Sequence, residues 1–145
     1  MELKLKNHEV VKALNFLSGL KLNANQTRPA TKLIRILDEV LQEIQDSQFA
    51  LIEMYGKRDE ENNLIQREKG QSHEIDPDHV EEYAKEVALL LNEEVVIDGG
   101  PFVKLIERLP GILENYEEKI DNAEAYIYDR LMDEFEKEEN QDVKD

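Results

Sequence analysis

The most constraining feature of this sequence is a long amphipathic stretch over residues 29–55. Its apolar residues recur at spacings of three and four, as on one face of a helix: Leu33, Ile34, Leu37, Val40, Leu41, Ile44, Leu51 and Ile52. Thr27 is the predicted N-cap, Pro29 suits the first turn, and Gly56 follows the last apolar residue. A helix of this length spans roughly 40 Å, which is longer than a small core is wide. The pattern therefore predicts a second long helix packed along it.

A second long amphipathic pattern covers about residues 112–136 and is close to a heptad seam. Its apolar positions are Leu113, Tyr116, Ile120, Ala123, Ile127, Leu131 and Phe135. We expect this helix to lie antiparallel against the helix of residues 28–56. The core should then be formed by Leu33, Leu37, Val40, Ile44, Leu51, Val87, Leu91, Ile120, Ile127 and Leu131.

Shorter elements lie between these two patterns. Helices are expected at residues 8–18 and 77–92, with Asn7 and Asp76 as their caps. Gly70 is expected in the turn of a hairpin. Strands of a small antiparallel sheet are expected at residues 2–6, 64–66, 73–75 and 95–97.

These elements together predict an α+β fold that is predominantly helical: two long antiparallel helices, shorter helices and a small antiparallel sheet. Residues 1–136 should form a single α-rich domain, because the chain has one domain's length. Residues 137–145 are strongly acidic and are expected to be a frayed tail.

The charge of the chain is large and uneven. Its 145 residues include 18 Lys and Arg against 34 Asp and Glu, a formal charge of −16. Residues 1–52 carry a net charge of +1, and residues 53–145 carry −17. An acidic body repels phosphate backbones, so direct nucleic-acid binding is not expected. The acidic excess either confers solubility or forms a surface that binds a basic partner or imitates nucleic acid.

Cysteine is absent from the sequence, which excludes thiolate nucleophiles, iron–sulfur clusters and Cys-based zinc sites. The longest apolar runs, residues 88–91 and 95–97, are far shorter than the ~20 residues of a membrane span. No basic-then-apolar leader opens the chain. We expect a cytoplasmic protein that does not associate with membranes.

The densest group of potential metal ligands lies within residues 73–79. Zinc or manganese would favour such side chains if they converged. Strand alternation instead sends His73 and Glu74 to opposite faces, Asp76 is explained as a helix cap, and the segment lacks the HExxH spacing. The sequence therefore predicts no metal site, no cofactor and no catalytic residue. A small metal-dependent enzyme, the alternative, would gather His73, Asp76, Asp78 and His79 in a deep pocket.

Two segments carry a resemblance to a known family. Residues 55–60 end the long helix with the pattern Tyr-Gly-x-x-Asp-Glu, and residues 90–97 read Leu-Leu-Asn-x-Glu-Val-x-Ile. Together with the Leu-rich N-terminus, they make the chain similar to small uncharacterised proteins encoded by tailed phages and prophages of Gram-positive bacteria. The resemblance covers about residues 1–100 and ends after Asp98. It implies a viral accessory or virion-associated protein and supplies no active site.

The favoured function is a non-enzymatic phage accessory protein that binds another protein, either in virion assembly or to inhibit a host factor. It would act in the host cytoplasm or in the virion, and a homo-oligomer is left open. An alternative is an acidic, nucleic-acid-mimicking anti-defence protein that occupies a basic groove of a host nuclease or effector. The expected partner-binding residues are Glu117, Glu118, Asp121, Glu124, Asp129, Asp133, Glu134 and Glu136.

Overall fold

The structure, a computed structural model, describes residues 1–67 and 72–144, with side chains described in that range except at residues 138–144. Internal contacts divide the chain into two compact units. Unit 1 comprises Met1–Leu41 and Glu94–Asp145, and unit 2 comprises Gln42–Glu93.

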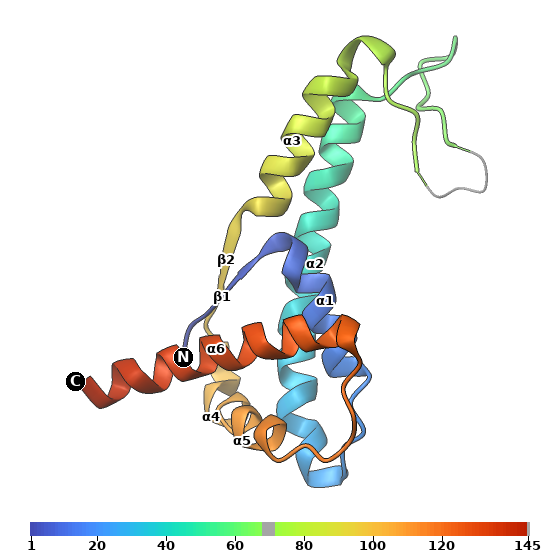
Figure 1. Cartoon of the computed structure of the whole chain (residues 1–145). Helices are drawn as coiled ribbons and strands as arrows, with labels where there is room; N and C mark the ends of the chain where they lie inside the picture. The colour runs from blue at the N-terminus through green and yellow to red at the C-terminus, as the bar shows by residue number, and fades with distance from the viewer. Residues whose placement is uncertain (68–71, 145) are drawn as a thin grey trace. The chain divides into compact units, whose positions relative to one another are not determined.

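The chain is mostly helical and has one two-stranded antiparallel sheet, so the predicted α+β class is confirmed (Figure 1). The elements, in chain order, are β1 (Leu3–Lys6), α1 (Asn7–Ser18), α2 (Ala24–Tyr55), the 3₁₀ turn η2 (Pro77–His79), α3 (Val80–Asn92), β2 (Glu94–Ile97), the 3₁₀ turn η3 (Gly100–Phe102), α4 (Val103–Ile106), α5 (Leu109–Glu114) and α6 (Asn122–Lys144).

The sheet of unit 1 pairs β1 with β2. Leu3 lies opposite Ile97 and both are buried, as is Leu5, whereas Lys4 and Lys6 are exposed. Leucine and lysine alternate along β1 with a period of two, so the leucine side chains face the core and the lysine side chains face water. The strands predicted at residues 2–6 and 95–97 are confirmed.

Helix α1 begins one residue earlier than expected. Asn7, the predicted cap, is the first helical residue and is buried, and Lys6 takes the cap position. The Lys6 amide donates to the Glu9 carboxylate at 2.9 Å, so a side chain three residues ahead satisfies a backbone donor that has no partner within the helix.

The core of unit 1 draws on both strands and on every α-helix of the unit. Its fully or nearly fully buried apolar side chains are Leu3, Leu5, Val10, Ala13, Phe16, Leu17, Ala30, Leu33, Leu37, Ile97, Ile106, Leu109, Leu113, Ile127, Leu131 and Phe135. Four of the predicted core residues are among them: Leu33, Leu37, Ile127 and Leu131.

The packing of α6 differs from the prediction. This helix packs against α1 and β1, and it crosses the unit 1 part of α2 instead of running antiparallel along it (Figure 1). An amphipathic seam specifies that a face will be covered, but it does not specify which element covers it. The helix also continues to Lys144, past the end predicted near residue 136.

The last predicted helix is interrupted between α5 and α6. The Asn115 side chain donates to the Gly111 carbonyl at 2.8 Å, and the Tyr128 hydroxyl donates to the Leu113 carbonyl at 3.2 Å. The same two carbonyl groups also accept the backbone amides of Asn115 and Tyr116, which close the last turn of α5. Tyr116 accepts a bond from the Lys21 amide at 3.1 Å and is held outside a helix. The break thus depends on partners distant in sequence.

Unit 2 contains a small closed ladder of backbone hydrogen bonds. The Lys57 amide donates to the Glu74 carbonyl, the Glu74 amide to Ile65, and the Ile65 amide back to Lys57, at 2.8–3.0 Å. A Cβ at Gly56 would collide with the Ile52 carbonyl oxygen, so glycine is required where the chain leaves α2. Three segments are therefore locked together directly after the helix.

The ladder shows that the four predicted strands do not form one sheet. Residues 64–66 and 73–75 do pair, through an antiparallel bridge between Gln66 and His73, but they join residues 56–58 and not the β1–β2 sheet. The turn predicted at Gly70 lies outside the described residues. The period-two pattern identified the segments, whereas their partner depends on how the chain folds back after α2.

Burial in unit 2 is much weaker than in unit 1. Of its described residues, only Ile44 is buried. Leu51, Val87 and Leu91, predicted as core, are half-buried, as are Val40 and Ile120 of unit 1. A segment of about 50 residues has too little volume to enclose a large core by itself.

Candidate functional site

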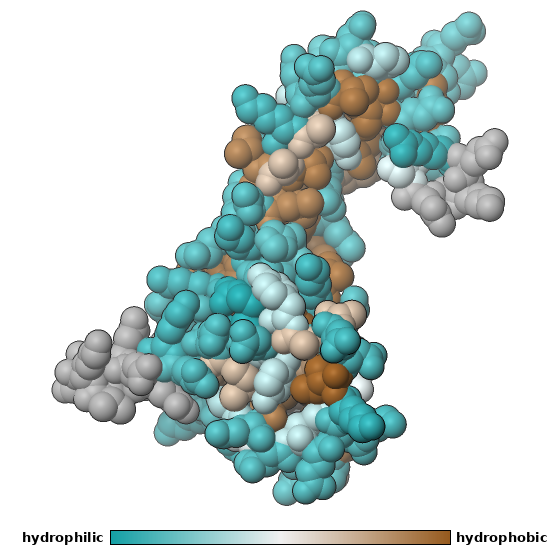
Figure 2. All heavy atoms as spheres, in the orientation of Figure 1, coloured by the Kyte–Doolittle hydropathy of each residue, from teal (hydrophilic) through white to brown (hydrophobic). Residues whose placement is uncertain are grey.

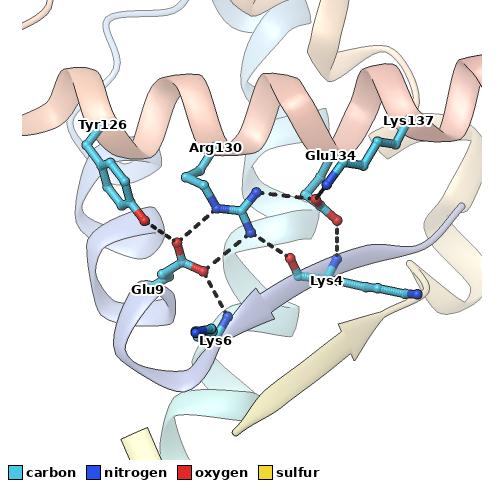
Figure 3. Close-up of polar contacts among 7 residues, drawn as sticks. All are labelled: Lys4, Lys6, Glu9, Tyr126, Arg130, Glu134 and Lys137. Carbon is cyan, nitrogen blue, oxygen red and sulfur yellow. Dashed lines mark hydrogen bonds and ion pairs between the residues drawn. The ribbon is translucent and has the colours of Figure 1, made fainter. Parts of the chain in front are cut away.

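A network of polar side chains connects α1, β1 and α6 in unit 1 (Figure 3). Glu9 is 2% exposed, and Nε of Arg130 lies 2.9 Å from its Oε2. The Tyr126 hydroxyl donates to the same oxygen at 2.9 Å. Arg130 also pairs with Glu134 at 3.2 Å, and the Lys137 ammonium reaches Glu134 at 3.0 Å. Arg130 thus pairs with two carboxylates, and one of these, Glu134, also pairs with Lys137.

The same network closes the outer edge of β1. The Lys4 amide donates to Glu134 at 2.9 Å, and Nη2 of Arg130 donates to the Lys4 carbonyl at 3.0 Å. The Lys6 amide is bonded to Glu9. Successive residues of an antiparallel strand turn their backbone groups to alternate sides. Side chains of α1 and α6 therefore occupy the position that a third strand would take.

The pKa values in the network follow from these contacts. Burial raises the pKa of Glu9, but hydrogen bonds from Arg130, the Lys6 amide and Tyr126 outweigh it and lower that pKa from 4.5 to about 2. Burial of Glu134 is likewise outweighed by its donors, and its pKa is lowered. The hydrogen bond to Glu9 raises the pKa of Arg130 and of Tyr126. Both carboxylates are therefore ionised at neutral pH.

This chemistry is that of a structural clamp. The network lines an open pocket of about 440 Å³, together with Glu2, His8 and Glu94. A carboxylate with a pKa of about 2 has no proton to donate near neutral pH and is a weak base. Glu9 and Glu134 are thus suited to holding β1 and α6 together, and not to transferring protons.

A second candidate surface is a shallow apolar groove in unit 2, with a volume of about 540 Å³. Apart from Arg67, it is lined by Ile75, Val80, Tyr83, Ala84, Val87, Ala88 and Leu91. All of these except Ile75 belong to α3 and recur at spacings of three and four, so they form one stripe. Figure 2 shows hydrophobic residues on the visible surface where Figure 1 places α3.

The groove face of α3 shares Tyr83 with the face that meets α2. Tyr55 near the end of α2 contacts the rings of His79 and Tyr83, with centroids 5.9 Å and 6.5 Å apart. Val80 on the groove stripe is 49% exposed. Leu89, on the side of α3 away from the groove, is 55% exposed. Of the α3 residues that line the groove, Val80, Ala84 and Ala88 are exposed, whereas Tyr83, Val87 and Leu91 are half-buried.

Most of the predicted partner-binding carboxylates lie on the surface. Glu117, Glu118 and Asp121 are exposed in the segment between α5 and α6. The α6 residues Asp129, Asp133 and Glu136 are exposed and Glu124 is half-exposed. The prediction that Glu134 is an exposed partner-binding residue is corrected. Glu134 is only 4% exposed, and its carboxylate is bound within the network. Its neighbours in sequence face outward, whereas it lies on the face of α6 that covers β1.

The residues of the metal-enzyme alternative have separate structural roles. The His73 ring packs edge-on against Phe49 at 5.8 Å, and Oδ1 of Asp76 accepts the Asp78 amide at 2.9 Å as the predicted cap. Asp76 and His79 line a shallow pocket that the other two do not reach. Among the side chains described, those of residues 1–67 and 72–137, no group of three or more potential ligands could hold a metal ion.

Sequence reasoning missed the network and misjudged the groove. Glu9 and Arg130 are 121 residues apart, and no local pattern connects them. The groove did have a signal: the apolar run at residues 88–91 extends around α3 beyond a single stripe. An apolar arc wider than one face indicates that more than one surface of the helix can be covered.

The chain was compared with curated proteins, with solved structures and with models of protein families. Searches of the curated proteins and of the solved structures found no significant match. None of the helices in the described chain is long and apolar enough to cross a membrane. The profile of the family described as "Protein of unknown function (DUF1617)" matches residues 1–142, which include almost all of α6 and extend past the limit of the resemblance at Asp98. The chain belongs to the DUF1617 family.

Proposed function

We propose that this protein is a non-enzymatic phage accessory protein that works by binding another protein. The observation that carries the proposal is the open apolar stripe of α3, whose side chains line a groove and are not enclosed by unit 2. Contiguous exposed apolar surface on a soluble chain is typical of a protein–protein interaction site. The sequence resemblance to phage-encoded proteins supports the phage origin.

The weak core of unit 2 supports the same conclusion. Its exposed large apolar residues include Phe49, Met54, Val80 and Leu89, with exposures between 44% and 69%. Each fully buried side chain of this kind contributes about 1.5–3 kcal/mol. A partner that covers the groove side of α3, where Val80 lies, would therefore supply stability that unit 2 lacks by itself. Either an assembling virion or a host factor could provide such a partner.

A second candidate function rests on the acidic surface. Asp129, Asp133 and Glu136 recur at spacings of four and three, so they share one exposed face of α6. A row of carboxylates of this kind would fit a protein that imitates nucleic acid and occupies a basic groove of a host nuclease or effector. The apolar groove is the stronger argument, because exposed carboxylates also serve solubility.

The experiment is affinity purification of the tagged chain from phage-infected Gram-positive cells, read by quantitative mass spectrometry. The groove variant is Ala84→Gln with Ala88→Gln, which fills the groove at two exposed helix positions with a good helix former. Leu89→Gln is the control on the other side of α3. We expect a partner that is retained by the wild type and the control and lost by the groove variant.

One outcome would move the binding site from the groove to α6, and another would contradict the proposal. A partner lost only on combining Asp129→Asn, Asp133→Asn and Glu136→Gln would favour the nucleic-acid-mimicking function. Turnover of a small molecule without any protein partner would favour an enzyme.

A further inference from the structure

We propose that the free edge of β2 binds an extended segment of a partner protein as a third strand, and that this segment carries a lysine or arginine opposite Glu94. The edge belongs to unit 1 and is separate from the groove of unit 2, so the inference goes beyond the proposed function. Two observations carry it. The backbone groups along this edge have no partner in the described chain, and the strand is acidic.

The sheet register shows which backbone groups of β2 face away from β1. Lys4 lies opposite Val96, and its amide and carbonyl are bonded to side chains of α6 and not to β2. Residues directly opposite one another in an antiparallel pair either exchange hydrogen bonds or both turn their backbone groups outward. The amide and carbonyl of Val96 therefore point to the free edge of β2. The same alternation places those of Glu94 on that edge.

This edge of β2 lacks the kind of cap that protects β1. Figure 3 shows β1 between α6 and β2, so the capping side chains of α6 lie on the far side of β1. The sheet has two strands, and the described residues supply no hydrogen bond to the backbone of Val96 or Glu94 on the free side. Val96 is 50% exposed, and Glu94 is exposed. Two donors and two acceptors are therefore available at the spacing of a strand.

Backbone groups at this spacing select an extended chain as the occupant. A helix has its backbone groups bonded internally, whereas an added strand can pair with each free amide and carbonyl of an edge. Unpaired strand edges are for this reason common sites of pairing with another chain. The side chains of β2 then decide which extended chain fits.

The existing partner of β2 shows which side chains pair with it. In β1, Lys6 lies opposite Glu94 and Lys4 lies opposite Val96, all on the exposed face of the sheet. Opposite charges at directly facing positions stabilise a strand pair. A segment that alternates apolar and basic residues, as β1 does, would repeat this arrangement on the other edge of β2.

The charges of the strand argue against a second copy of this chain as the occupant. β2 contains one acidic residue and no basic residue, and exposed Glu93 and Asp98 flank it. Antiparallel pairing of two β2 strands places the two Glu94 side chains opposite or diagonal to one another, or places Glu94 opposite Asp98. Like charges that face one another across strands destabilise the pairing. A basic residue opposite Glu94 removes that repulsion.

The first test uses the full chain and two synthetic peptides of about eight residues, which is within the usual length of a strand. Both peptides alternate valine with a charged residue, lysine in one and glutamate in the other. Fluorescence anisotropy measures their binding. We expect the lysine peptide to bind at least about fivefold more tightly than the glutamate peptide. NMR should show slower hydrogen exchange at the Val96 amide when the lysine peptide is bound.

Methylated peptides test the strand geometry on the wild-type chain. Two series of the lysine peptide carry N-methyl groups on alternate backbone amides, one on the odd and one on the even positions. Only one set of amides faces β2 in an added strand. We expect that series to bind at least about tenfold more weakly, because each methyl group removes a donor and blocks close approach. The other series should change less than about threefold.

Matched variants locate the binding. Val96→Pro removes an amide that β1 does not use, and should weaken the lysine peptide at least about tenfold. Val96→Thr keeps the amide and the β-branched shape, and should change binding less than about threefold. Glu94→Lys should reverse the preference, so that the glutamate peptide binds more tightly. Ala84→Gln with Ala88→Gln in unit 2 should leave binding unchanged, which separates this edge from the surface of the proposed function.

Four results would overturn the inference. Equal loss of binding in both methylated series, or in neither, would show that the peptide does not bind as a strand. Equal or stronger binding of the glutamate peptide would exclude a basic segment. A dimer in sedimentation velocity that Val96→Pro dissociates would identify a second copy as the occupant. If neither peptide binds the wild-type chain, the edge does not accept an added strand.

Discussion

Arg130 connects three partners in the described unit 1 network. Its guanidinium bonds to Glu9, to Glu134 and to the Lys4 carbonyl. The planar fork of five donors makes this possible, because it presents several N–H groups in fixed directions. Glu9 depends on this arrangement most, since its carboxylate is almost completely removed from water. The network therefore makes stability sensitive to the charge of one buried residue.

Glu9→Gln should be about 3 kcal/mol less stable than the wild type at pH 7, since a pKa lowered from 4.5 to about 2 corresponds to that contribution. The folded pKa lies below the unfolded one, so this stability is present above pH 4.5 and is lost as the pH falls toward 2. The difference between variant and wild type should shrink over that range. Urea unfolding at a series of pH values measures it.

The control for this experiment is Glu107→Gln, which removes an exposed carboxylate and should leave stability nearly unchanged at every pH. A Glu9→Gln deficit that stays constant from pH 7 to pH 2 would contradict the assignment of the lowered pKa to the ionised Glu9 carboxylate.

At the scale of elements, β1 is a short strand with two differently protected edges. One edge pairs with β2, and the other is capped by side chains of α1 and α6. Exposed strand edges are prone to unwanted pairing with other chains, and capping removes that opportunity. Only the period-two pattern of β1 could be predicted from the sequence. Glu9 caps the edge from three residues away, but Arg130 and Glu134 come from more than 100 positions away, and no local pattern identifies them.

Arg130→Lys should open this edge. A lysine ammonium is a compact point charge, and it cannot reach Glu9, Glu134 and the Lys4 carbonyl in the bidentate manner of arginine. We expect a loss of about 1–2 kcal/mol in stability and faster hydrogen exchange at the Lys4 amide, measured by NMR.

Lys137→Gln serves as the comparison for that prediction, because Lys137 is 69% exposed and its pair with Glu134 is a surface contact. Such a contact is worth less than about 1 kcal/mol. Arg130→Lys keeps the positive charge, so a loss no larger than that of Lys137→Gln would show that the guanidinium geometry does not hold this edge.

At the scale of the whole molecule, the two units differ in how much they bury. Unit 1 has a core contributed by two strands and several helices, whereas Ile44 is the one buried residue among those described in unit 2. Helix α2 belongs to both, with its first part in unit 1 and the rest in unit 2. The free energy of local opening should therefore differ along a single helix.

Hydrogen exchange monitored by mass spectrometry should show this difference. Amides of α2 before Leu41 should be protected to nearly the global stability, and those after Gln42 and in α3 should exchange through smaller openings. Uniform protection across both units would instead support the single cooperative domain that the sequence predicts for residues 1–136.

The sequence by itself determined much of the local structure: the body of the long helix, the helix start at Asp76 and Pro77, and the short strand at residues 95–97. Each depends on neighbours a few positions apart, through capping, periodicity and backbone preference. The predicted start of the long helix was wrong, because α2 begins at Ala24, and Thr27 and Pro29 lie inside it. Tertiary structure alone decided that α6 packs on α1 and β1, that Glu134 is buried, and that the stripe of α3 stays open. These outcomes depend on which surfaces meet. The apolar pattern of a helix predicts that one face will be buried, but it does not specify which element will cover that face.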